Sequence, residues 1–216
     1  MKTNRNKEIL QFLKELTANN NREWFHANKE RYDVLKKAFE EQVKELINLI
    51  TLFDPEIAGL EVKDCTYRIY RDIRFSPDKR PYKAYMGAYI AKGGGRKSEY
   101  GGYYVHLEPD NCLLSGGIYM PDPKLLKKLR QDIYNQADEF MGIMEIPVFK
   151  KTYGPLESEM MLSRVPAGFP SDTPYAEILK HKNFTVCAYK PDSFFEKEDW
   201  MNEAVADFRT LQPFNR

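Results

Sequence analysis

The sequence predicts an α+β fold in which an antiparallel β-sheet is flanked by N-terminal and C-terminal helices. Apolar residues recur at helical spacing near both ends of the chain, whereas the central part alternates with the period of strands. The connections between the central strands are short, and short connections favour antiparallel pairing over crossover helices. Runs of helices on either side of a run of strands are typical of the α+β class.

N-terminal helices are predicted over residues 4–53. The first has an inward stripe at helical spacing that consists of Ile9, Phe12, Leu13 and Leu16. A run of three asparagines ends it, and Asn20 with Glu23 has the spacing of a capping box, which predicts the start of a second helix. This second helix continues to about Phe53, a length that allows for a break inside it.

The sheet is predicted over about residues 65–119, with one more strand near residues 183–189. Even spacing of aromatic and β-branched residues, separated by turn-forming segments, marks the strands. The central strands are expected at residues 66–75, 82–91, 103–107 and 112–119.

C-terminal helices and one strand are predicted over residues 122–216. Asp122 and Pro123 form an N-cap and first-turn pair for an amphipathic helix that ends near Phe140. Residues 145–171 lack a regular pattern, a short helix begins at Thr173, and an amphipathic helix follows from Asp192. Because the chain shows neither an internal repeat nor a linker, we expect one domain over residues 1–216.

Composition indicates a globular protein of a reducing compartment. Hydrophobic residues make up 42% and charged residues 30% of the 216 residues, which disfavours intrinsic disorder. The three cysteines are far apart and form no Cys-x-x-Cys pair, so neither a zinc knuckle nor a disulfide framework is expected. No stretch is long and apolar enough for a membrane span, and the N-terminus lacks a secretory pattern. We therefore expect a soluble protein, most simply a cytoplasmic one, and no role at a membrane.

The charge is balanced over the whole chain but not within it. Residues 68–97 contain nine basic and two acidic residues, a net charge of +7, while the remaining 24 basic and 30 acidic residues give −6. Clustered arginine and lysine concentrate anions, and arginine forks suit phosphate or carboxylate oxygens. We expect a small phosphorylated or carboxylated ligand in a cationic, tyrosine-rich cleft on the sheet. The candidate binding residues are Arg68, Tyr70, Arg71, Arg74, Lys79 and Lys83, with Asn21 and Arg22 from the helix connection.

The same basic segment allows other interpretations. Arginines with neighbouring tyrosines suit a nucleic-acid-binding or protein-interaction module, although the overall near-neutral charge opposes binding of a long polyanion. The arginines can also be purely structural, because an arginine such as Arg71 among apolar neighbours requires a partner. The segment Gly93–Ser98 has the composition of a phosphate cradle, yet a flexible hairpin tip is the simpler interpretation, since no Walker motif is present.

Whether the protein is an enzyme stays open, and no cofactor or metal is expected. The best candidates for acid–base catalysis are Asp72, His106 and Glu108. His106 and Glu108 point to the same face of one predicted strand, a pairing that suits a metal ion or a proton transfer. Two ligands do not complete a metal site, and a hydrogen-bonded histidine of the sheet is the simpler alternative. Oligomeric state cannot be derived from these patterns.

Several long segments carry a resemblance to a known family. They include NNNREWFHANKERY at residues 19–32, YRIYRDIRFSPDKRPYK at residues 67–83 and GGYYVHLE at residues 101–108. Together with residues 12–16 they resemble a widespread microbial family of conserved hypothetical proteins, domain of unknown function 2461. The similarity is sharpest over residues 12–121. It implies a one-domain protein of this length, and it brings no activity, cofactor or catalytic residue to these positions.

Overall fold

The computed structural model describes residues 4–95 and 98–216. The N-terminal half contains the helices α1 (Asn6–Ala18), α2 (Arg22–Ala27), α3 (Lys29–Thr51) and α4 (Val62–Cys65), and the 3-10 helix η1 (Pro55–Ile57). The C-terminal half contains α5 (Pro123–Asn135), α6 (Ala137–Glu145), α7 (Pro147–Tyr153), α8 (Ala176–Lys180), α9 (Asp192–Glu196) and α10 (Trp200–Leu211). The strands are β1 (Met86–Ala91), β2 (Gly102–Leu107), β3 (Cys112–Ile118) and β4 (Phe184–Lys190).

Within the described residues the strands form one four-stranded antiparallel sheet in the order β1-β2-β3-β4. Helices precede the sheet and follow it in the chain, which confirms the predicted α+β class. The final strand reaches the sheet after the α5–α8 region, so residues far apart in the sequence pair across β3 and β4.

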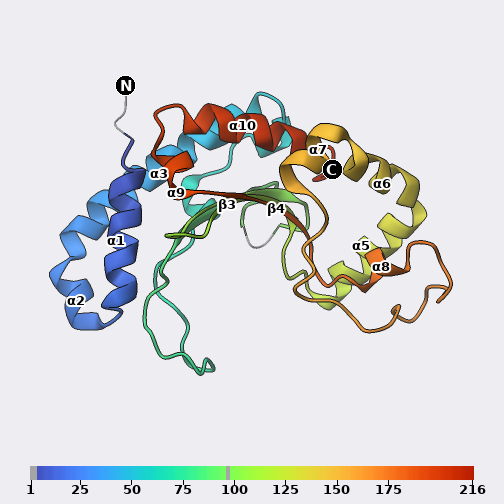
Figure 1. The fold of residues 1–216 in the computed structure, drawn as a ribbon, viewed down its shortest axis with the longest axis horizontal. Helices are drawn as coiled ribbons and strands as arrows, with labels where there is room; N and C mark the ends of the chain where they lie inside the picture. Colours follow the sequence, from blue (N-terminus) through green and yellow to red (C-terminus); the bar gives the residue numbers. More distant parts are fainter. Residues whose placement is uncertain (1–3, 96–97) are drawn as a thin grey trace.

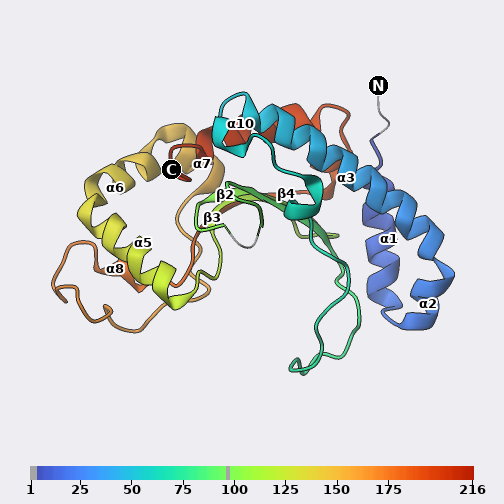
Figure 2. The same ribbon diagram turned by 180° about the vertical axis from the view of Figure 1, so that it is seen from behind.

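One face of the sheet is covered by helices. In Figures 1 and 2, α3 and α10 lie side by side across this face. Alternate strand residues such as Ala88, Val105, Leu114 and Val186 point into this layer and are fully buried. The apolar stripe of α1 joins the same core, since all four of its predicted inward residues have no exposed surface.

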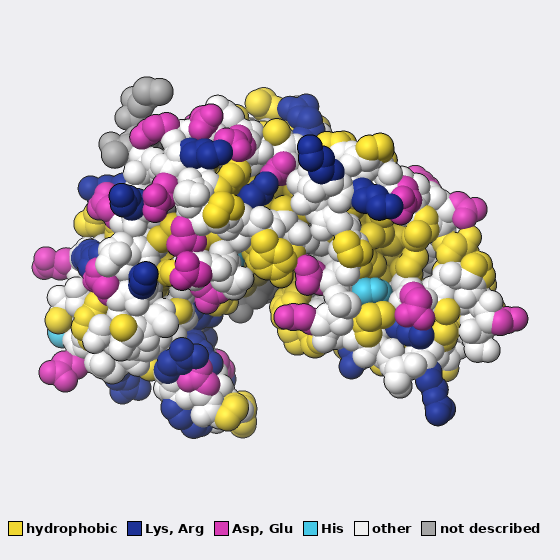
Figure 3. All heavy atoms as spheres, in the orientation of Figure 1, with side chains coloured by type: hydrophobic (Ala, Val, Ile, Leu, Met, Phe, Trp, Pro, Cys, Tyr) yellow, Lys and Arg dark blue, Asp and Glu magenta, His cyan; other side chains and the backbone are white. Residues whose placement is uncertain are grey.

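The opposite face of the sheet borders a hollow in the molecular surface. The hollow lies between a long protruding loop on one side and the α5–α8 region on the other, and Figure 3 shows it as a notch in the molecular surface. Because side chains alternate along strands, this face carries Tyr89, Tyr104, His106, Ser115 and Cys187. The polar face of the sheet is therefore the one that helices leave uncovered.

The N-terminal helices differ from the prediction in the cap of α2. The long second helix is divided at Asn28 into α2 and α3, the break that its length allows. The cap of α2 is Asn21 rather than Asn20, because the Asn21 side chain accepts a hydrogen bond from the Trp24 backbone at 2.9 Å. The Asn20 side chain instead bonds both backbone groups of Tyr82, at 3.0 and 3.1 Å.

The strand predicted at residues 66–75 is wrong. Residues 66–85 form a protruding loop, called here the arm (Figure 1). An isolated bridge joins Thr66 at its start to Ala88 of β1, and a second, Tyr70–Tyr82, joins its two limbs. Further contact comes from the backbone N–H of Lys83, which donates to the Ile69 carbonyl at 2.8 Å. Two prolines on the returning side of the arm lack the N–H that a ladder requires, so regular pairing begins only at Met86.

The C-terminal half follows the prediction in outline. The Asp122 side chain caps α5 by accepting from the backbone N–H groups of Lys124 and Leu125. The single helix expected up to Phe140 is divided at Gln136 into α5 and α6, and α7 occupies part of the stretch expected to be irregular. Pro147 lies in the first turn of α7, where proline is common. It is therefore a sequence signal for the start of this helix, which the hydrophobic pattern does not show.

Across residues 4–95 and 98–216, no helix combines the length and the apolar character that crossing a membrane requires.

Candidate functional site

The arm holds most of its charged side chains in local ion pairs. Asp78 accepts from the guanidinium groups of Arg71 and Arg80 at 2.6 and 2.7 Å, and Asp72 accepts from Arg74 at 2.7 Å. The bonds from Arg74 lower the pKa of Asp72 to about 2. Both carboxylates therefore stay ionised at neutral pH, and each offsets part of the cationic charge around it.

The base of the arm borders a cleft of about 650 Å³, a volume that suits a small molecule. Its walls are the C-terminal part of α1, the arm, and the turn between β2 and β3. We call it the arm cleft. Its lining residues are Lys14, Thr17, Ala18, Asn20, Arg71, Asp72, Asp78, Arg80, Tyr82, Lys83, Ala84, Tyr85, Glu108, Pro109 and Asp110.

Aromatic rings surround the ammonium group of Lys83 in this cleft. Its Nζ lies 5.2 Å from the ring centre of Tyr67 and 5.4 Å from that of Tyr85. Cation–π attraction at such distances restrains the position of the ammonium group. Tyr82, whose ring stacks on Phe25 of α2 at 4.0 Å, ties the arm to the helices.

A chain of hydrogen bonds lies next to the arm cleft. The Tyr104 hydroxyl lies 2.7 Å from Nδ1 of His106, and Nε2 of His106 lies 3.1 Å from Oε2 of Glu108. A carboxylate can only accept, so Nε2 carries the proton and Nδ1 accepts from the tyrosine. Asn111 Nδ2 donates to the same Glu108 oxygen at 2.6 Å. The arrangement fixes the imidazole tautomer and the position of the carboxylate.

The two ends of this hydrogen-bonded chain differ in charge: the Glu108 end is a carboxylate and the Tyr104 end is a neutral hydroxyl. Hydrogen bonds from His106 and then Asn111 hold the pKa of Glu108 below its ordinary value, although burial opposes them. Burial raises the pKa of Tyr104, so its hydroxyl keeps its proton. His106 is 8% exposed, and its imidazole lies against the Tyr85 ring in a tilted arrangement with ring centres 4.6 Å apart, which links the hydrogen-bonded chain to the cleft wall.

The comparison with protein families agrees with the resemblance of the motifs. The model of the family described as conserved hypothetical protein (DUF2461) matches residues 8–216, nearly the whole chain. The chain belongs to the DUF2461 family. No curated protein and no solved structure matches it.

The candidate residues of this DUF2461 chain fall into two groups. Arg71 and Lys83, together with the acid–base candidates Asp72 and Glu108, line the arm cleft. The remaining candidates are not among its lining residues: Arg68, Tyr70, Arg74, Lys79, Asn21 and Arg22 on the arm and α2, and His106 behind Tyr85. The cleft also lies beside the sheet rather than on its open face, because the expected strand at 66–75 leaves the sheet as the arm.

Several of the outlying residues have structural contacts instead. The Tyr70 ring packs against Phe25 and Tyr82, with ring centres 6.1 and 5.5 Å apart. Lys79 donates to the Ile73 carbonyl at 3.1 Å, and the basic and acidic side chains at the end of the arm are intermixed in Figure 3. The structure therefore brings together only part of the cationic set that the sequence indicates.

Other lining residues escape sequence reasoning. Lys14 is one lysine among many on a helix surface, and nothing in its neighbourhood in the sequence marks it. Tyr85 lies two residues after Lys83, so the alternation along a strand does carry a signal for it. Asn20 lines the cleft while Asn21 caps α2, the reverse of the predicted roles.

Two further candidates are the glycine-rich segment and the His106–Glu108 pair. The segment Gly93–Ser98 includes Arg96 and Lys97, which lie outside the described residues. Its described glycine Gly95 has φ 44° and approaches Asp64 so closely that a Cβ would meet the Asp64 carbonyl oxygen at 2.0 Å. Among the residues that the structure describes, no three His, Cys, Asp or Glu side chains gather as metal ligands, so the His106–Glu108 pair lacks a third member.

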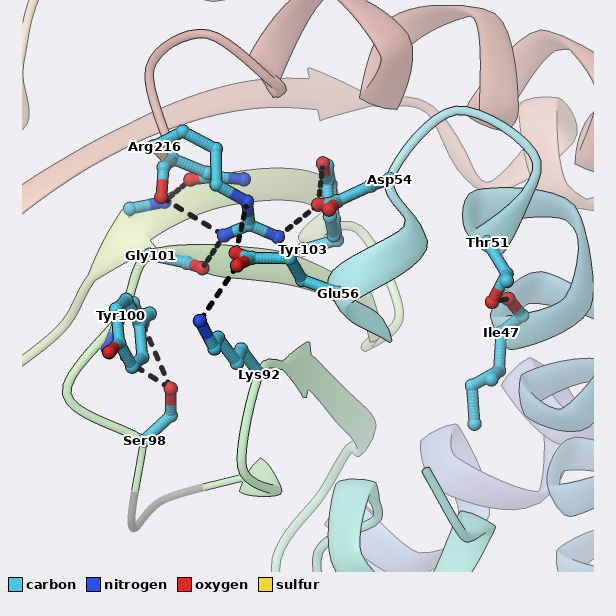
Figure 4. Close-up of polar contacts among 12 residues, drawn as sticks. Ile47, Thr51, Asp54, Glu56, Lys92, Ser98, Tyr100, Gly101, Tyr103 and Arg216 are labelled. Atoms are coloured by element: carbon cyan, nitrogen blue, oxygen red, sulfur yellow. Dashed lines mark hydrogen bonds and ion pairs between the residues drawn. The ribbon is translucent and has the colours of Figure 1, made fainter. Parts of the chain in front are cut away.

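A second polar cluster lies at the other end of the sheet (Figure 4). Arg216 pairs with Asp54 and, at 3.1 Å, with Glu56, and the Tyr103 hydroxyl donates to Asp54 at 2.7 Å. Lys92 completes the cluster by pairing with Glu56 at 2.7 Å. Asp54 is 1% exposed, and the cluster links η1, β2 and the residue after β1 to Arg216. None of its members is among the residues that line the arm cleft.

Proposed function

We propose that the arm cleft binds a small anionic ligand, phosphorylated or carboxylated. The observation that carries the proposal is the cleft of about 650 Å³ that gathers cationic side chains from two separate elements. They are Lys14 of α1 and Arg71, Arg80 and Lys83 of the arm. In a partly closed site, ammonium and guanidinium groups bind carboxylate or phosphate oxygens through charge-assisted hydrogen bonds.

Lys14 and Lys83 offer ammonium groups to an anion, and Arg71 and Arg80 offer guanidinium groups. Arg71 and Arg80 already share the carboxylate of Asp78, so an anion gains less from them. The ammonium group of Lys83 lies 5.2 and 5.4 Å from the ring centres of Tyr67 and Tyr85. Tyr82 and Tyr85 offer the aromatic surface on which the apolar part of a ligand can pack.

A thermal-shift screen tests the proposal. The probes are inorganic phosphate, citrate, a sugar phosphate and a nucleotide. A ligand at about 100 times its Kd adds about 2.7 kcal/mol of stability. For a chain of this size that raises Tm by about 5–10 °C.

The double variant Lys14→Met with Lys83→Met is expected to lose this shift. The control Lys127→Met, at an exposed position of α5 outside the cleft, is expected to keep it. Absence of any shift at millimolar concentrations of all four probes refutes the proposal, as does an undiminished shift in the double variant.

A second candidate function, nucleic-acid or protein interaction through the arm, is favoured by one observation. Phe75 is 93% exposed on the arm, and the Arg74 guanidinium lies 5.9 Å from its ring centre. An exposed aromatic ring beside an arginine suits stacking on a nucleic-acid base or packing against a protein partner. The test is a gel shift with single-stranded and double-stranded DNA: retardation that weakens steeply with salt supports this function. Unchanged mobility at low salt removes nucleic acid as the partner.

A third candidate assigns the arginines to structure alone. The pairs Arg74–Asp72 and Arg80–Asp78 support it, although solvent screens exposed pairs of this kind and they contribute little to stability. It predicts that Arg71→Met changes the stability of the arm and leaves the affinity for every anionic probe unchanged. A loss of affinity in Arg71→Met with unchanged stability argues for the anion site instead.

The proposal includes a reducing, cytoplasmic location. It is supported by the three cysteines, which are all free thiols: Cys65, Cys112 and Cys187. Fractionation of cells that express the tagged protein tests it, and recovery outside the cytoplasm contradicts it.

A further inference from the structure

The charges that line the arm cleft are unevenly distributed between its walls. Lys14, Arg71, Arg80 and Lys83 come from α1 and the arm, and the arm also contributes the carboxylates of Asp72 and Asp78. That side of the cleft therefore has a net charge of +2. The third wall is the turn between β2 and β3. It contributes the two carboxylates of Glu108 and Asp110, and none of its lining residues is basic.

The acidic wall is built into the fold rather than being a pair of loose surface residues. Among the described residues, the hydrogen bonds to the Glu108 carboxylate come from His106 and Asn111, and both end on its Oε2. Neither donor uses Oε1, so that oxygen can accept from a ligand without breaking the chain. Asp110 is held by its backbone N–H, which donates to the Asp192 carboxylate at 3.0 Å.

A purely anionic ligand fits only one of these walls. In the cleft its negative charge is repelled by the turn that carries Glu108 and Asp110, and the repulsion grows with the number of its charges. A ligand that also carries an ammonium group gains a charge-assisted hydrogen bond at the turn and is complementary to both walls. The charged turn thus selects against polyanions and in favour of ligands of mixed charge.

We propose that the ligand of the arm cleft is a small zwitterion, with a carboxylate or phosphate at one end and a primary ammonium group at the other. The anionic end binds beside Lys14 and Lys83, and the ammonium group binds at the β2–β3 turn, where Glu108 accepts from it. This inference rests on the proposed function, because it names the class of ligand for the same cleft.

Matched pairs of probes test the ammonium requirement separately from anion binding. One pair is 5-aminopentanoate and pentanoate, and the other is O-phosphoethanolamine and ethyl phosphate. Isothermal titration gives the Kd of each compound for the full chain. The ammonium member of each pair is expected to bind about tenfold more tightly, as one additional charge-assisted hydrogen bond provides.

Two substitutions on the turn locate the effect. Glu108→Gln preserves the shape of the side chain and an acceptor oxygen for His106 and Asn111, and it is expected to reduce the tenfold preference to about twofold. Asp110→Asn is the second variant, since asparagine tolerates the positive φ of 62° at this position. The control Glu139→Gln, at an exposed position of α6, is expected to keep the full preference.

The outcomes distinguish this inference from the proposed function. Equal affinity for both members of each pair overturns the zwitterion and leaves the anion site intact. An unchanged preference in both turn variants also overturns it, because the ammonium group then binds elsewhere. Absence of binding by all four compounds, together with a negative thermal-shift screen, removes the proposed function itself.

Discussion

Arg216→Met is expected to destabilise the protein strongly, although it changes a single side chain far from the arm cleft. Asp54 is 1% exposed, and its carboxylate has two partners, Arg216 and the hydroxyl of Tyr103 (Figure 4). Without Arg216, a buried negative charge loses its counter-charge and keeps one neutral donor. Removing one partner of a buried ion pair costs about 3–5 kcal/mol.

The partial exposure of Arg216, 19% of its side chain, places the expected loss at the lower end of this range, about 3 kcal/mol. That is a large part of a typical stability of about 5–15 kcal/mol. It lowers Tm by about 6–12 °C for a chain of this size. Urea denaturation followed by circular dichroism measures the loss, and calorimetry measures the shift in Tm.

Two further variants isolate the cause. The double variant Asp54→Asn with Arg216→Met removes the unpaired charge, so it is expected to recover part of the stability lost in the single variant. Arg164→Met, at an exposed loop position, is the control and is expected to change stability by less than about 0.5 kcal/mol. A loss below about 0.5 kcal/mol in Arg216→Met itself refutes the assignment of a buried charge pair.

Three other predictions concern the polar face of the sheet and the thiols. Hydrogen bonds from His106 and then Asn111 lower the pKa of Glu108 in the folded protein. These bonds therefore stabilise the fold at pH values above the ordinary pKa of a glutamate, and the stabilisation is lost as the pH falls through the lowered pKa of Glu108. The stability deficit of Asn111→Ala is therefore expected at pH 7 and should shrink on acidification; a deficit independent of pH contradicts the bond. Gly87→Ala places a Cβ 2.7 Å from the Tyr104 hydroxyl and is expected to destabilise by about 1 kcal/mol, with partial recovery in a Gly87→Ala/Tyr104→Phe double variant. Burial raises the pKa of each thiol to about 11 or 12, so all are expected to react slowly with Ellman's reagent at pH 8 until urea is added: Cys65, Cys112 and Cys187. A thiol that reacts in the native protein as fast as free cysteine contradicts this.

The sequence predicts the helices and the paired strands well because their periodicity is local. The stripe that begins at Ile9 has helical spacing, and it is buried as one face of α1. Likewise, Tyr103 and Val105 alternate with polar neighbours and are buried as the helix-covered face of β2. In these elements the local pattern and the tertiary contacts agree.

The arm shows where periodicity fails. Residues 66–75 have the composition of a strand, but a strand also needs a partner that offers backbone groups along its length. The returning limb contains Pro77 and Pro81, and regular pairing starts only at Met86, so the alternation has no sheet to join. The same departure moves the basic residues away from the sheet face and into local pairs with Asp72 and Asp78.

The arm cleft is only partly predictable for a different reason. Its walls come from α1, the arm and the β2–β3 turn, which meet only through the fold, so Lys14 carries no local signal. The hydrogen-bonded chain from Tyr104 through His106 to Glu108 is nearer to prediction, because its members lie two residues apart along β2 and the residue that follows it. Their spacing places them on one face, whereas the order of the hydrogen bonds and the contact with Asn111 are known only from the structure.

The most direct test of an anion site in the arm cleft is an NMR titration of the ¹⁵N-labelled protein with inorganic phosphate. If the cleft binds the anion, the amide signals that move saturably belong to its walls, those of Asn20, Lys83, Tyr85 and Asp110 among them. The Lys14→Met/Lys83→Met variant is then expected to lose these shifts. Saturable shifts confined to other parts of the chain, or no saturable shift at millimolar phosphate, contradict an anion site in this cleft.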